Sequence, residues 1–338
     1  MNIPSILAKC AGKKNLSREE AFEMQNKIIK GKLSQDELLK IFQFFAARPI
    51  TPAELMGILE ATRKHMIKVP ITSDALDVCG TGGDGQHTFN ISTITAIICA
   101  ATGVPIVKHC GRAASGICGS ADLLKLLDVN IDLTPEQAVA CFGTCGIVFL
   151  FAPNFQPGLK IVKDARKKFG GKTYFNFLGP MLNPASVSHQ LIGVSDKTMM
   201  RLMGKTLIDF GSKKIILVHS EDGGDEVGLS EKTIIMEFDG TREQKKYELT
   251  HSDFGLPRFH GDLKTTSREE NVSICRQILM GRSDEPKKNV AMANAALAFY
   301  TFGKVSNIRD GVRLAEETIS SEKALKKLEQ VIKVTHNL

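Results

Sequence analysis

The residues best suited to chemistry are concentrated in residues 77–85, which hold four glycines within six positions. Glycines directly after a strand let backbone N–H groups approach an anion closely. Asn90 and Ser92 follow at the start of an apolar helical pattern, where either side chain suits a cap and the free N–H groups form a second anion site. The two sites together predict a ligand with two phosphate groups, and the alternative is a plain tight turn.

Two familiar phosphate loops do not account for this segment. No Gly-Lys-Ser/Thr ending follows the glycines, so the loop is not of the Walker type. Gly80, Gly82 and Gly85 match Gly-x-Gly-x-x-Gly, but a dinucleotide site also needs an acidic residue about twenty positions further on. That place holds Lys108 and His109, and a basic residue there favours phosphate over a ribose hydroxyl.

A second loop with oxyanion-binding character follows the apolar run 104–107. It contains Lys108, His109, Gly111, Arg112, Ser115, Gly116, Gly119 and Ser120. Lysine, arginine, serine and repeated glycine are typical of such sites. His109 is a candidate general base, with a structural role as the alternative. Cys110 and Cys118 lie in the same loop, and we favour packing over a reactive thiolate for both.

Two adjacent carboxylates, Asp225 and Glu226, follow the turn 222–224. On a glycine turn they can converge on one hard cation, whereas a regular strand would point them apart. Mg²⁺ is the cation expected beside a phosphate ester. An exposed acidic turn is the alternative. Nothing in the sequence indicates that the pKa values of the two groups diverge, as acid–base work would require.

The elements that position these residues change in character along the chain. The first seventy or so residues read as helices, and a connector at 69–73 marks a domain boundary. Three helix starts there fit a capping box: Ser17 with Glu20, Ser34 with Glu37, and Thr51 with Glu54.

Beyond this boundary, short β-branched runs alternate with helical patterns. Strands are expected at 104–107, 147–151, 190–194 and 214–218, and helices at 92–102, 134–145, 197–210 and 290–302. This alternation predicts an α/β fold with a largely parallel sheet. Residues 239–288, dense in charge and turn formers, are expected to hold loops and edge elements.

Composition narrows the class of protein. A chain of 338 residues is long enough for two domains, and 43% hydrophobic with 24% charged residues excludes a disordered chain or a collagen. The net charge of +7 is compatible with an anionic ligand or nucleic acid. Eight cysteines without a Cys-x-x-Cys pair predict a reduced, cytoplasmic protein. Cys141 and Cys145 lack zinc-site partners, and we find neither a signal peptide nor a membrane span.

Taken together, these segments resemble the anthranilate phosphoribosyltransferases. The matching motifs occur in family order at residues 80–85, 88–93, 108–109, 119–122, 149–153, 175–180, 183–184 and 225–226. The glycine loop combined with the Asn-Ile-Ser-Thr helix start is highly specific. The resemblance implies a helical domain, 1–72, joined by a segment near 168–186. It also implies an α/β domain, 73–338, of the nucleoside-phosphorylase-like kind, and a homodimer.

The resemblance further implies transfer of a phosphoribosyl group from 5-phosphoribosyl 1-pyrophosphate to the amine of anthranilate, in the tryptophan branch. It implies donor contacts at Gly80, Gly83, Asp84, Thr88, Asn90, Ser92, Thr93, Lys108 and Ser120. Ser92, Asp225 and Glu226 are implied to hold Mg²⁺, and Gly80, Gly111 and Arg166 to contact the acceptor. Arg166 matches the family arginine that pairs with the anthranilate carboxylate.

The acceptor half departs from the family pattern in three places. Gly111 stands where the family has an asparagine that touches anthranilate, and Gln156 stands where it has a histidine. The small, serine-rich loop is altered as well, at residues 116–118. Three hypotheses therefore stay open: transfer to anthranilate, transfer to another small aromatic or heterocyclic acceptor, and an inactive relative that binds nucleic acid. The intact Asp84, Ser92, Asp225 and Glu226 argue against the third.

Overall fold

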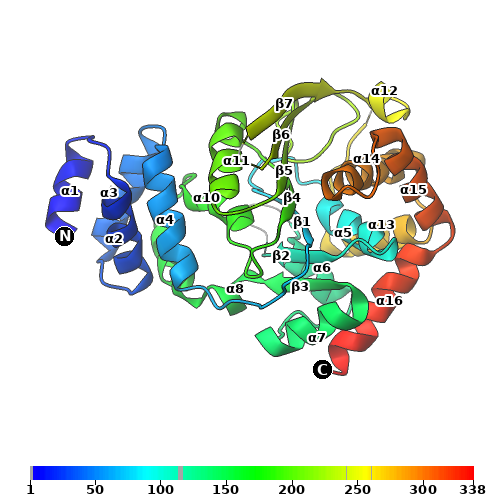
Figure 1. The fold of residues 1–338 in the computed structure, drawn as a ribbon, viewed down its shortest axis with the longest axis horizontal. Helices are drawn as coiled ribbons and strands as arrows, with labels where there is room; N and C mark the ends of the chain where they lie inside the picture. Colours follow the sequence, from blue (N-terminus) through cyan, green and yellow to red (C-terminus); the bar gives the residue numbers. More distant parts are fainter. Residues whose placement is uncertain (1–2, 113–116, 241, 260) are drawn as a thin grey trace. The chain divides into compact units, whose positions relative to one another are not determined.

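The computed structural model describes residues 3–112, 117–240, 242–259 and 261–338 (Figure 1). The chain divides into two compact units, one of Met1–Lys68 with Ala152–Pro184 and the other of Val69–Phe151 with Ala185–Leu338. The second segment of the first unit therefore starts well before residue 168. Within the described residues no helix is long and apolar enough to cross a membrane.

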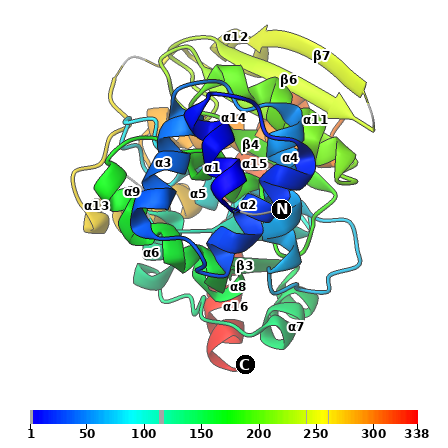
Figure 2. The ribbon, with the colours of Figure 1, turned by 90° about the vertical axis from the view of Figure 1, so that its left-hand side faces the viewer.

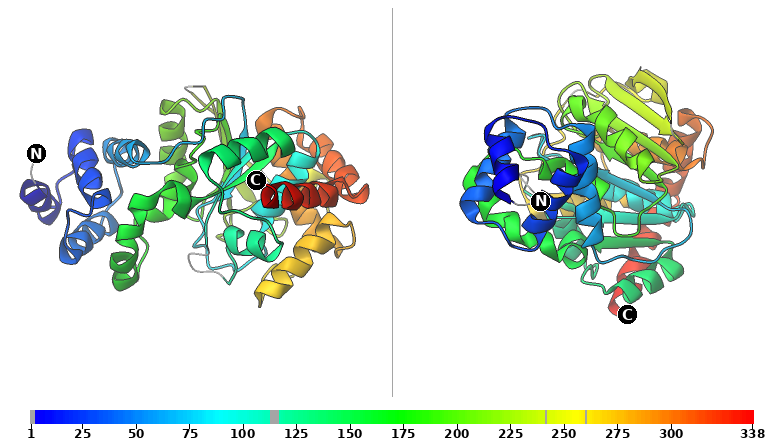
Figure 3. Two further views of the ribbon diagram at one scale, coloured as in Figure 1. Left: turned by 90° about the horizontal axis from the view of Figure 1, so that it is seen from below. Right: turned by 60° about the vertical axis from the view of Figure 1, so that its left-hand side comes forward.

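The N-terminal helices of the first unit begin where the capping boxes predict. Both reciprocal bonds of the box are present at α2 (Arg18–Ile29), α3 (Gln35–Ala46) and α4 (Pro52–Lys64). Figure 3 shows these helices grouped with α1 (Ile3–Ala11). The second segment contributes α8 (Ala152–Phe155), α9 (Lys163–Phe169), α10 (Phe175–Leu178) and the 3₁₀ turns Pro157–Val162 and Gly179–Met181.

Aromatic side chains join the two segments of the first unit. The Phe42 ring meets those of Phe169 and Phe175 edge-on, each with 5.9 Å between ring centres. Tyr174, fully buried, lies against Phe45 and donates its hydroxyl to Gln25 at 2.9 Å. Edge-on aromatic packing of this kind adds to the stability gained from burial alone.

The second unit is built on a seven-stranded sheet of order β3-β2-β1-β4-β5-β6-β7. Its strands are β1 (Leu76–Gly80), β2 (Ile106–Cys110), β3 (Ile147–Phe151), β4 (His189–Gly193), β5 (Lys214–Ser220), β6 (Thr233–Asp239) and β7 (Arg242–Leu249). The first five are parallel, and β6 and β7 pair antiparallel. The predicted α/β fold with a mainly parallel sheet is confirmed, and β7 forms an edge (Figure 2).

Helices flank this sheet. They are α5 (Ile91–Ala101), α6 (Ser120–Leu126), α7 (Pro135–Cys145), α11 (Met200–Asp209) after a 3₁₀ turn at Lys197–Met199, α12 (His251–Phe254), α13 (Arg268–Leu279), α14 (Glu285–Phe302), α15 (Ile308–Ser320) and α16 (Lys323–His336). The central helix α14 starts with the charged residues Glu285, Lys287 and Lys288 and is buried on all sides from Asn289 to Phe299, where it is mostly apolar. It packs on α5 and α15. In turn, α16 packs on α5 and α7 (Figure 3).

Two expectations differ from the structure. Strand β2 lies at Ile106–Cys110 instead of 104–107, because its parallel ladder with β3 continues through Lys108 and His109. These two residues are therefore part of a strand and do not open a loop. Residues 239–288 hold edge strand β7, as expected, but also the regular helix α13, whose buried stripe includes Ile274 and Ile278.

Candidate functional site

The glycine loop follows β1 and adopts a conformation that requires glycine. Gly82, Gly83 and Gly85 have φ of 64°, 71° and 77°, in the left-handed region that L side chains rarely enter. Thr81 anchors the start of the loop, because its hydroxyl accepts a hydrogen bond from the Ser195 N–H at 3.0 Å. A succession of such conformations exceeds what a simple tight turn needs, and it suits a loop that presents N–H groups to an anion.

The predicted carboxylates lie against the glycine loop. Asp225 is buried, and its Oδ2 accepts the Gly82 N–H at 2.6 Å. A Cβ on Gly80 would lie 2.5 Å from that oxygen, and a Cβ on Gly193 would lie 1.4 Å from the Asp225 backbone oxygen. Glycines at the ends of β1 and β4 therefore make room for the acidic segment, by which we mean residues 222–226. Sequence reasoning did not single out Gly193.

Several predicted donor and cation residues share one pocket. Asp84 and Thr88 line it together with Asp225, Glu226 and Ile91. Thr88 is held by a β-bridge to Lys264. The structure thus brings residues from the glycine loop and from the 225–226 pair to one place, although they are about 140 positions apart in the sequence.

Burial and mutual repulsion raise the pKa values of these carboxyl groups. The pKa of Asp225 is raised to about 7, first by burial and then by the charge of Asp84. The pKa of Glu226 is raised well above its ordinary value, first by burial and then by Asp225, while the charge of Lys108 opposes the shift. The backbone N–H of Ser92, at the start of α5, also opposes the rise in the pKa of Glu226. Such a cluster favours a bound cation, which removes the repulsion.

Lys108 supplies the opposite charge from inside β2. Its side chain is 2% exposed, and its Nζ donates to the Val78 carbonyl and to Ser92 Oγ, the latter at 3.2 Å. The structure places this ammonium, the Ser92 hydroxyl and the Glu226 carboxylate around the N-terminus of α5. A buried lysine is costly unless it meets such partners.

The pH dependence of stability follows from the raised pKa of Asp225. The unfolded carboxyl titrates near 3.8 and the folded one near 7, so its contribution to stability is complete below 3.8 and is lost as pH rises through 7. With a chelator present, the free energy of unfolding of Asp225→Asn should therefore rise relative to that of the native chain as the pH increases from 4 to 7. Urea unfolding across this range measures the difference. Asp209→Asn, an exposed change, should give no such trend, and a pH-independent gain at Asp225 would contradict the assignment.

Asn294 of α14 binds the backbone of Val227, the residue that directly follows Asp225 and Glu226. Its Oδ1 accepts the Val227 N–H and its Nδ2 donates to the Val227 carbonyl, both at 3.0 Å. Asn294 is 1% exposed and lies within the apolar run 290–299 of the helix. An amide inside that run is the signal by which the sequence could have revealed this role, because a buried polar side chain must find a partner.

Substituting Asn294 by leucine should leave both Val227 backbone groups unpaired. We expect a loss of about 2–4 kcal/mol in the free energy of unfolding, measured in urea. The matched control is Thr301→Val on the same helix, whose hydroxyl bonds only the Leu297 carbonyl at 2.7 Å. Its loss should stay near 1 kcal/mol. Equal losses for the two variants would show that Asn294 has no special part in holding the segment.

The cap expected at α5 is absent. Asn90 occupies the N-cap position, but its side chain makes no cap hydrogen bond. Instead its Nδ2 donates to the Cys118 carbonyl at 3.2 Å and to Asn271 Oδ1 at 3.0 Å. Asn271 on α13, which sequence reasoning missed, thereby fixes Asn90. Thr93 is fully buried, and its hydroxyl has no hydrogen-bond partner among the described residues.

Gly111 and Ser120 are brought together by the second loop. The Ser120 hydroxyl lies 3.4 Å from the Gly111 N and 3.3 Å from its carbonyl oxygen. Ser115 and Gly116 lie outside the described residues. Burial raises the pKa of the Cys110 thiol to about 12 and also raises that of Cys118, so both thiols stay protonated near neutral pH. This agrees with packing roles for the two cysteines.

Comparison with known proteins places this site in a family. A model of the glycosyl transferase family, a/b domain, matches residues 72–325. The anthranilate phosphoribosyltransferase of Methanobrevibacter smithii is 37% identical over 99% of this chain and 100% of its own length. The chain belongs to the anthranilate phosphoribosyltransferase family. The enzyme of that name from a Geobacillus species is 36% identical over 96% of each chain.

Solved anthranilate phosphoribosyltransferases share the fold. The Thermus thermophilus structure has a TM-score of 0.89 at 31% identity and covers 98% of this chain and 99% of its own. The Saccharomyces cerevisiae enzyme in complex with phosphoribosyl pyrophosphate and Mg has a TM-score of 0.91 at 26% identity, with 99% and 98% covered. Another structure of the yeast enzyme contains 4-fluoroanthranilate.

Two residues of the acceptor half of this anthranilate phosphoribosyltransferase relative lie in the first unit: the predicted acceptor residue Arg166, and Gln156, which departs from the family pattern. Arg166 on α9 is partly buried, which lowers its pKa, and its guanidinium lies 5.7 Å from the Phe175 ring centre. Gln156 is buried, and its Nε2 donates to the Leu182 carbonyl at 2.6 Å. The Gln156 amide is thus engaged by the backbone of its own unit.

The residues of this site fit a magnesium ion. Anthranilate phosphoribosyltransferases use such an ion together with a phosphate-bearing substrate. Among the described residues no three His, Cys, Asp or Glu side chains form a complete metal cage. Mg²⁺ is usually held by one or two carboxylates, with water and substrate phosphates as the remaining ligands. Asp225 and Glu226 line one pocket and the charge of Asp225 raises the pKa of Glu226, so the pair provides hard oxygen ligands of that number.

Proposed function

We propose that this protein transfers the phosphoribosyl group of 5-phosphoribosyl 1-pyrophosphate to the amine of anthranilate and releases pyrophosphate. The observation that carries the proposal is one pocket lined by Asp84 of the glycine loop together with the carboxylates Asp225 and Glu226. The buried Lys108 lies beside it, bonded to Ser92 and acting on the charge of Glu226. Full-length similarity to anthranilate phosphoribosyltransferases supports it. In the reaction a C–N bond forms at the anomeric carbon, the bond to pyrophosphate breaks, and the amine loses a proton.

The donor half of the site carries the leaving charge. Lys108 and the N–H groups of the glycine loop are placed to stabilise negative charge as pyrophosphate departs. Asp225 and Glu226, with Ser92 beside them, would hold Mg²⁺, which when bound supplies positive charge to the diphosphate. Asp84, Thr88, Asn90, Thr93 and Ser120 complete the proposed donor contacts. Gly80 and Gly83 let the ligand approach the backbone.

The acceptor half needs orientation more than activation. An aromatic amine is already a nucleophile, so holding it in line behind the anomeric carbon provides much of the rate. We assign to Arg166 the pairing with the acceptor carboxylate, because a guanidinium binds a carboxylate through two parallel hydrogen bonds. No general base is assigned.

The test is release of pyrophosphate from phosphoribosyl pyrophosphate and Mg²⁺, with and without anthranilate. Anthranilate-dependent release supports the proposal. Absence of release, with the donor still raising the melting temperature, would mean that the acceptor is a different aromatic or heterocyclic compound. Absence of donor binding would contradict transfer to anthranilate and transfer to any other acceptor. A salt-sensitive gel shift without donor binding would favour an inactive relative that binds nucleic acid.

Arg166→Gln should raise KM for anthranilate by roughly ten- to a hundredfold, as expected for loss of one charge-assisted hydrogen-bonding group. The KM for the donor should change little. Steady-state kinetics with each substrate varied in turn measures both values. The neighbouring exposed Lys167→Gln is the charge-matched control. An equal rise in both KM values would argue that Arg166 acts on the fold and not on the acceptor.

A different acceptor is a second candidate, favoured by Gly111 and Gln156. Gly111 has no side chain to offer, and the Gln156 amide is already bonded to the Leu182 carbonyl. Loss of a polar contact to a buried ligand costs about 1–3 kcal/mol, which changes preference without abolishing binding. Competition between anthranilate and substituted or heterocyclic amines in the release assay ranks the two candidates.

We further propose a homodimer in the cytoplasm. The eight cysteines are all free thiols, which suits a reducing compartment. Light scattering after size-exclusion chromatography determines the number of subunits.

A further inference from the structure

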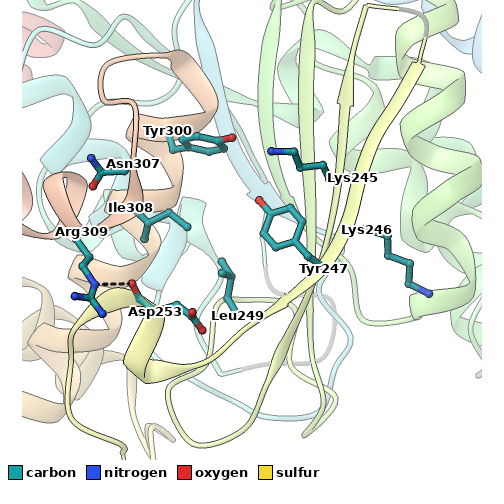
Figure 4. Close-up of a pocket in the computed structure, with 9 residues that line it drawn as sticks. All are labelled: Lys245, Lys246, Tyr247, Leu249, Asp253, Tyr300, Asn307, Ile308 and Arg309. Carbon is teal, nitrogen blue, oxygen red and sulfur yellow. Dashed lines mark hydrogen bonds between the residues drawn. The ribbon is translucent and has the colours of Figure 1, made fainter.

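The second unit contains another pocket that shares no lining residue with the pocket of Asp225 and Glu226. It has a volume of about 880 Å³ and lies where edge strand β7 faces the end of α14 and the start of α15 (Figure 4). Pockets of about 300–1,000 Å³ are typical of small-molecule sites. The proposed transfer reaction makes no use of its residues.

Aromatic and aliphatic side chains form its walls. Tyr247 and Leu249 project from β7, Tyr300 from α14, and Ile308 from α15 (Figure 4). Two of the three tyrosines in the chain thus meet in this one pocket. Rings and branched aliphatic groups of this kind suit a planar, largely apolar ligand.

The two tyrosine rings are held in place by a buried carboxylate. The hydroxyls of Tyr247 and Tyr300 lie 3.3 and 3.4 Å from the two oxygens of Glu237, which is 5% exposed. Lys214 pairs with the same carboxylate at 3.2 Å, and its Nζ lies 4.2 Å from the centre of the Tyr300 ring. Because this network fixes the rings in advance, a ligand that stacks on them loses little side-chain entropy.

The rim of the pocket carries positive charge. Lys245 and Lys246 both line the pocket. The Lys245 side chain extends toward Tyr300, whereas that of Lys246 points in another direction, as the alternation along a strand requires (Figure 4). Lys245 makes no ion pair with any residue that the structure describes. Arg309 donates to the carbonyls of Ser252 and Asp253, so its charge is not neutralised by a direct carboxylate contact.

Among the described residues that line the pocket, the acidic one is Asp253, and its carboxylate already has hydrogen-bond partners. The Asp253 carboxylate accepts the Thr250 N–H at 2.7 Å and the Thr250 hydroxyl at 2.8 Å. The site therefore combines fixed aromatic walls with an ammonium group that has no ion-pair partner among the described residues. We propose that it binds a small planar aromatic carboxylate, with the ring against Tyr247 and Tyr300 and the carboxylate at Lys245.

The absence of tryptophan from the chain gives a local test. In Tyr247→Trp the only indole lies in this pocket, and titration with 4-nitrobenzoate should quench its fluorescence to saturation. Adding Lys245→Glu should weaken the apparent affinity at least roughly tenfold, as loss of a charge-assisted bond predicts. Lys246→Glu, the same charge change on the other side of the strand, should alter it less than roughly twofold.

Three results would overturn the proposal: quenching that does not saturate, equal effects of the two lysine changes, or equal affinity for neutral 4-nitrobenzamide. Should Tyr247→Trp not fold, Tyr300→Trp serves as the reporter in the same titration. Because the indole reports only this pocket, binding at the acceptor site does not enter the signal. Lys245→Glu should leave pyrophosphate release unchanged, so this proposal and the proposed function can fail separately.

Discussion

Replacing Asp225 by asparagine and Glu226 by glutamine together is expected to reduce phosphoribosyl transfer roughly a thousandfold. Asp225 and Glu226 are the adjacent pair of carboxylates in the described pocket, which Asp84, Asp222 and Asp262 also line. A bound metal contributes several kcal/mol to stabilising a leaving phosphate. The measurement is kcat/KM from pyrophosphate release at saturating Mg²⁺.

The same double variant separates a metal role from a structural one. Each amide keeps the shape of the side chain, and the asparagine can still accept the Gly82 N–H, so the fold should persist. In the absence of metal its stability at pH 8 should equal or exceed that of the native chain, since buried like charges have been removed. Activity that survives the double change, with the fold intact, would mean that these residues do not hold the cation.

Gly193→Ala is expected to destabilise the second unit by about 3 kcal/mol or more. The added Cβ would lie 1.4 Å from the backbone oxygen of Asp225, so the chain itself must move and no side-chain rotation can relieve the overlap. Displacing this segment should also remove cation binding. Urea unfolding and a Mg²⁺ titration of the donor-dependent melting shift measure the two effects.

Two further glycine variants frame this result. Gly143→Ala, on α7 with open space around it, should gain about 0.5–1 kcal/mol because alanine favours a helix. Gly80→Ala meets the Asp225 carboxylate at 2.5 Å, and that side chain can rotate, so we expect a folded protein with weaker cation binding. If Gly193→Ala unfolds at the same urea concentration as the native chain, the close approach of Gly193 to the Asp225 backbone is contradicted.

The sequence predicted the features that have a local physical cause. The capping boxes, the glycine loop and strand Ile147–Phe151 each follow from neighbouring residues. It also predicted that the loop and the acidic pair belong to one site. Contacts between distant segments leave no such periodic signal: the bonds of Asn294 to Val227 and of Asn271 to Asn90 join residues 67 and 181 positions apart.

The missed helix cap shows how such contacts override local preference. An asparagine before an apolar helix ordinarily bonds the helix N–H groups. Here Asn271 and the Cys118 carbonyl take the Asn90 amide instead. The bounds of β2 were missed for the same reason. Pairing with β3 carries the strand through Lys108 and His109 to Cys110, beyond the end that β-branched composition indicates.

The hydrogen bond from Gly82 to Asp225 has a thermodynamic consequence. It links the glycine loop to the acidic segment, since neither can move relative to the other without breaking the 2.6 Å hydrogen bond. The two segments therefore change position together. Two ligands that act on segments linked in this way must be coupled, and the coupling is reciprocal: whatever factor the cation adds to donor affinity, the donor adds to cation affinity. The order in which they arrive then affects the route of assembly but not its end state.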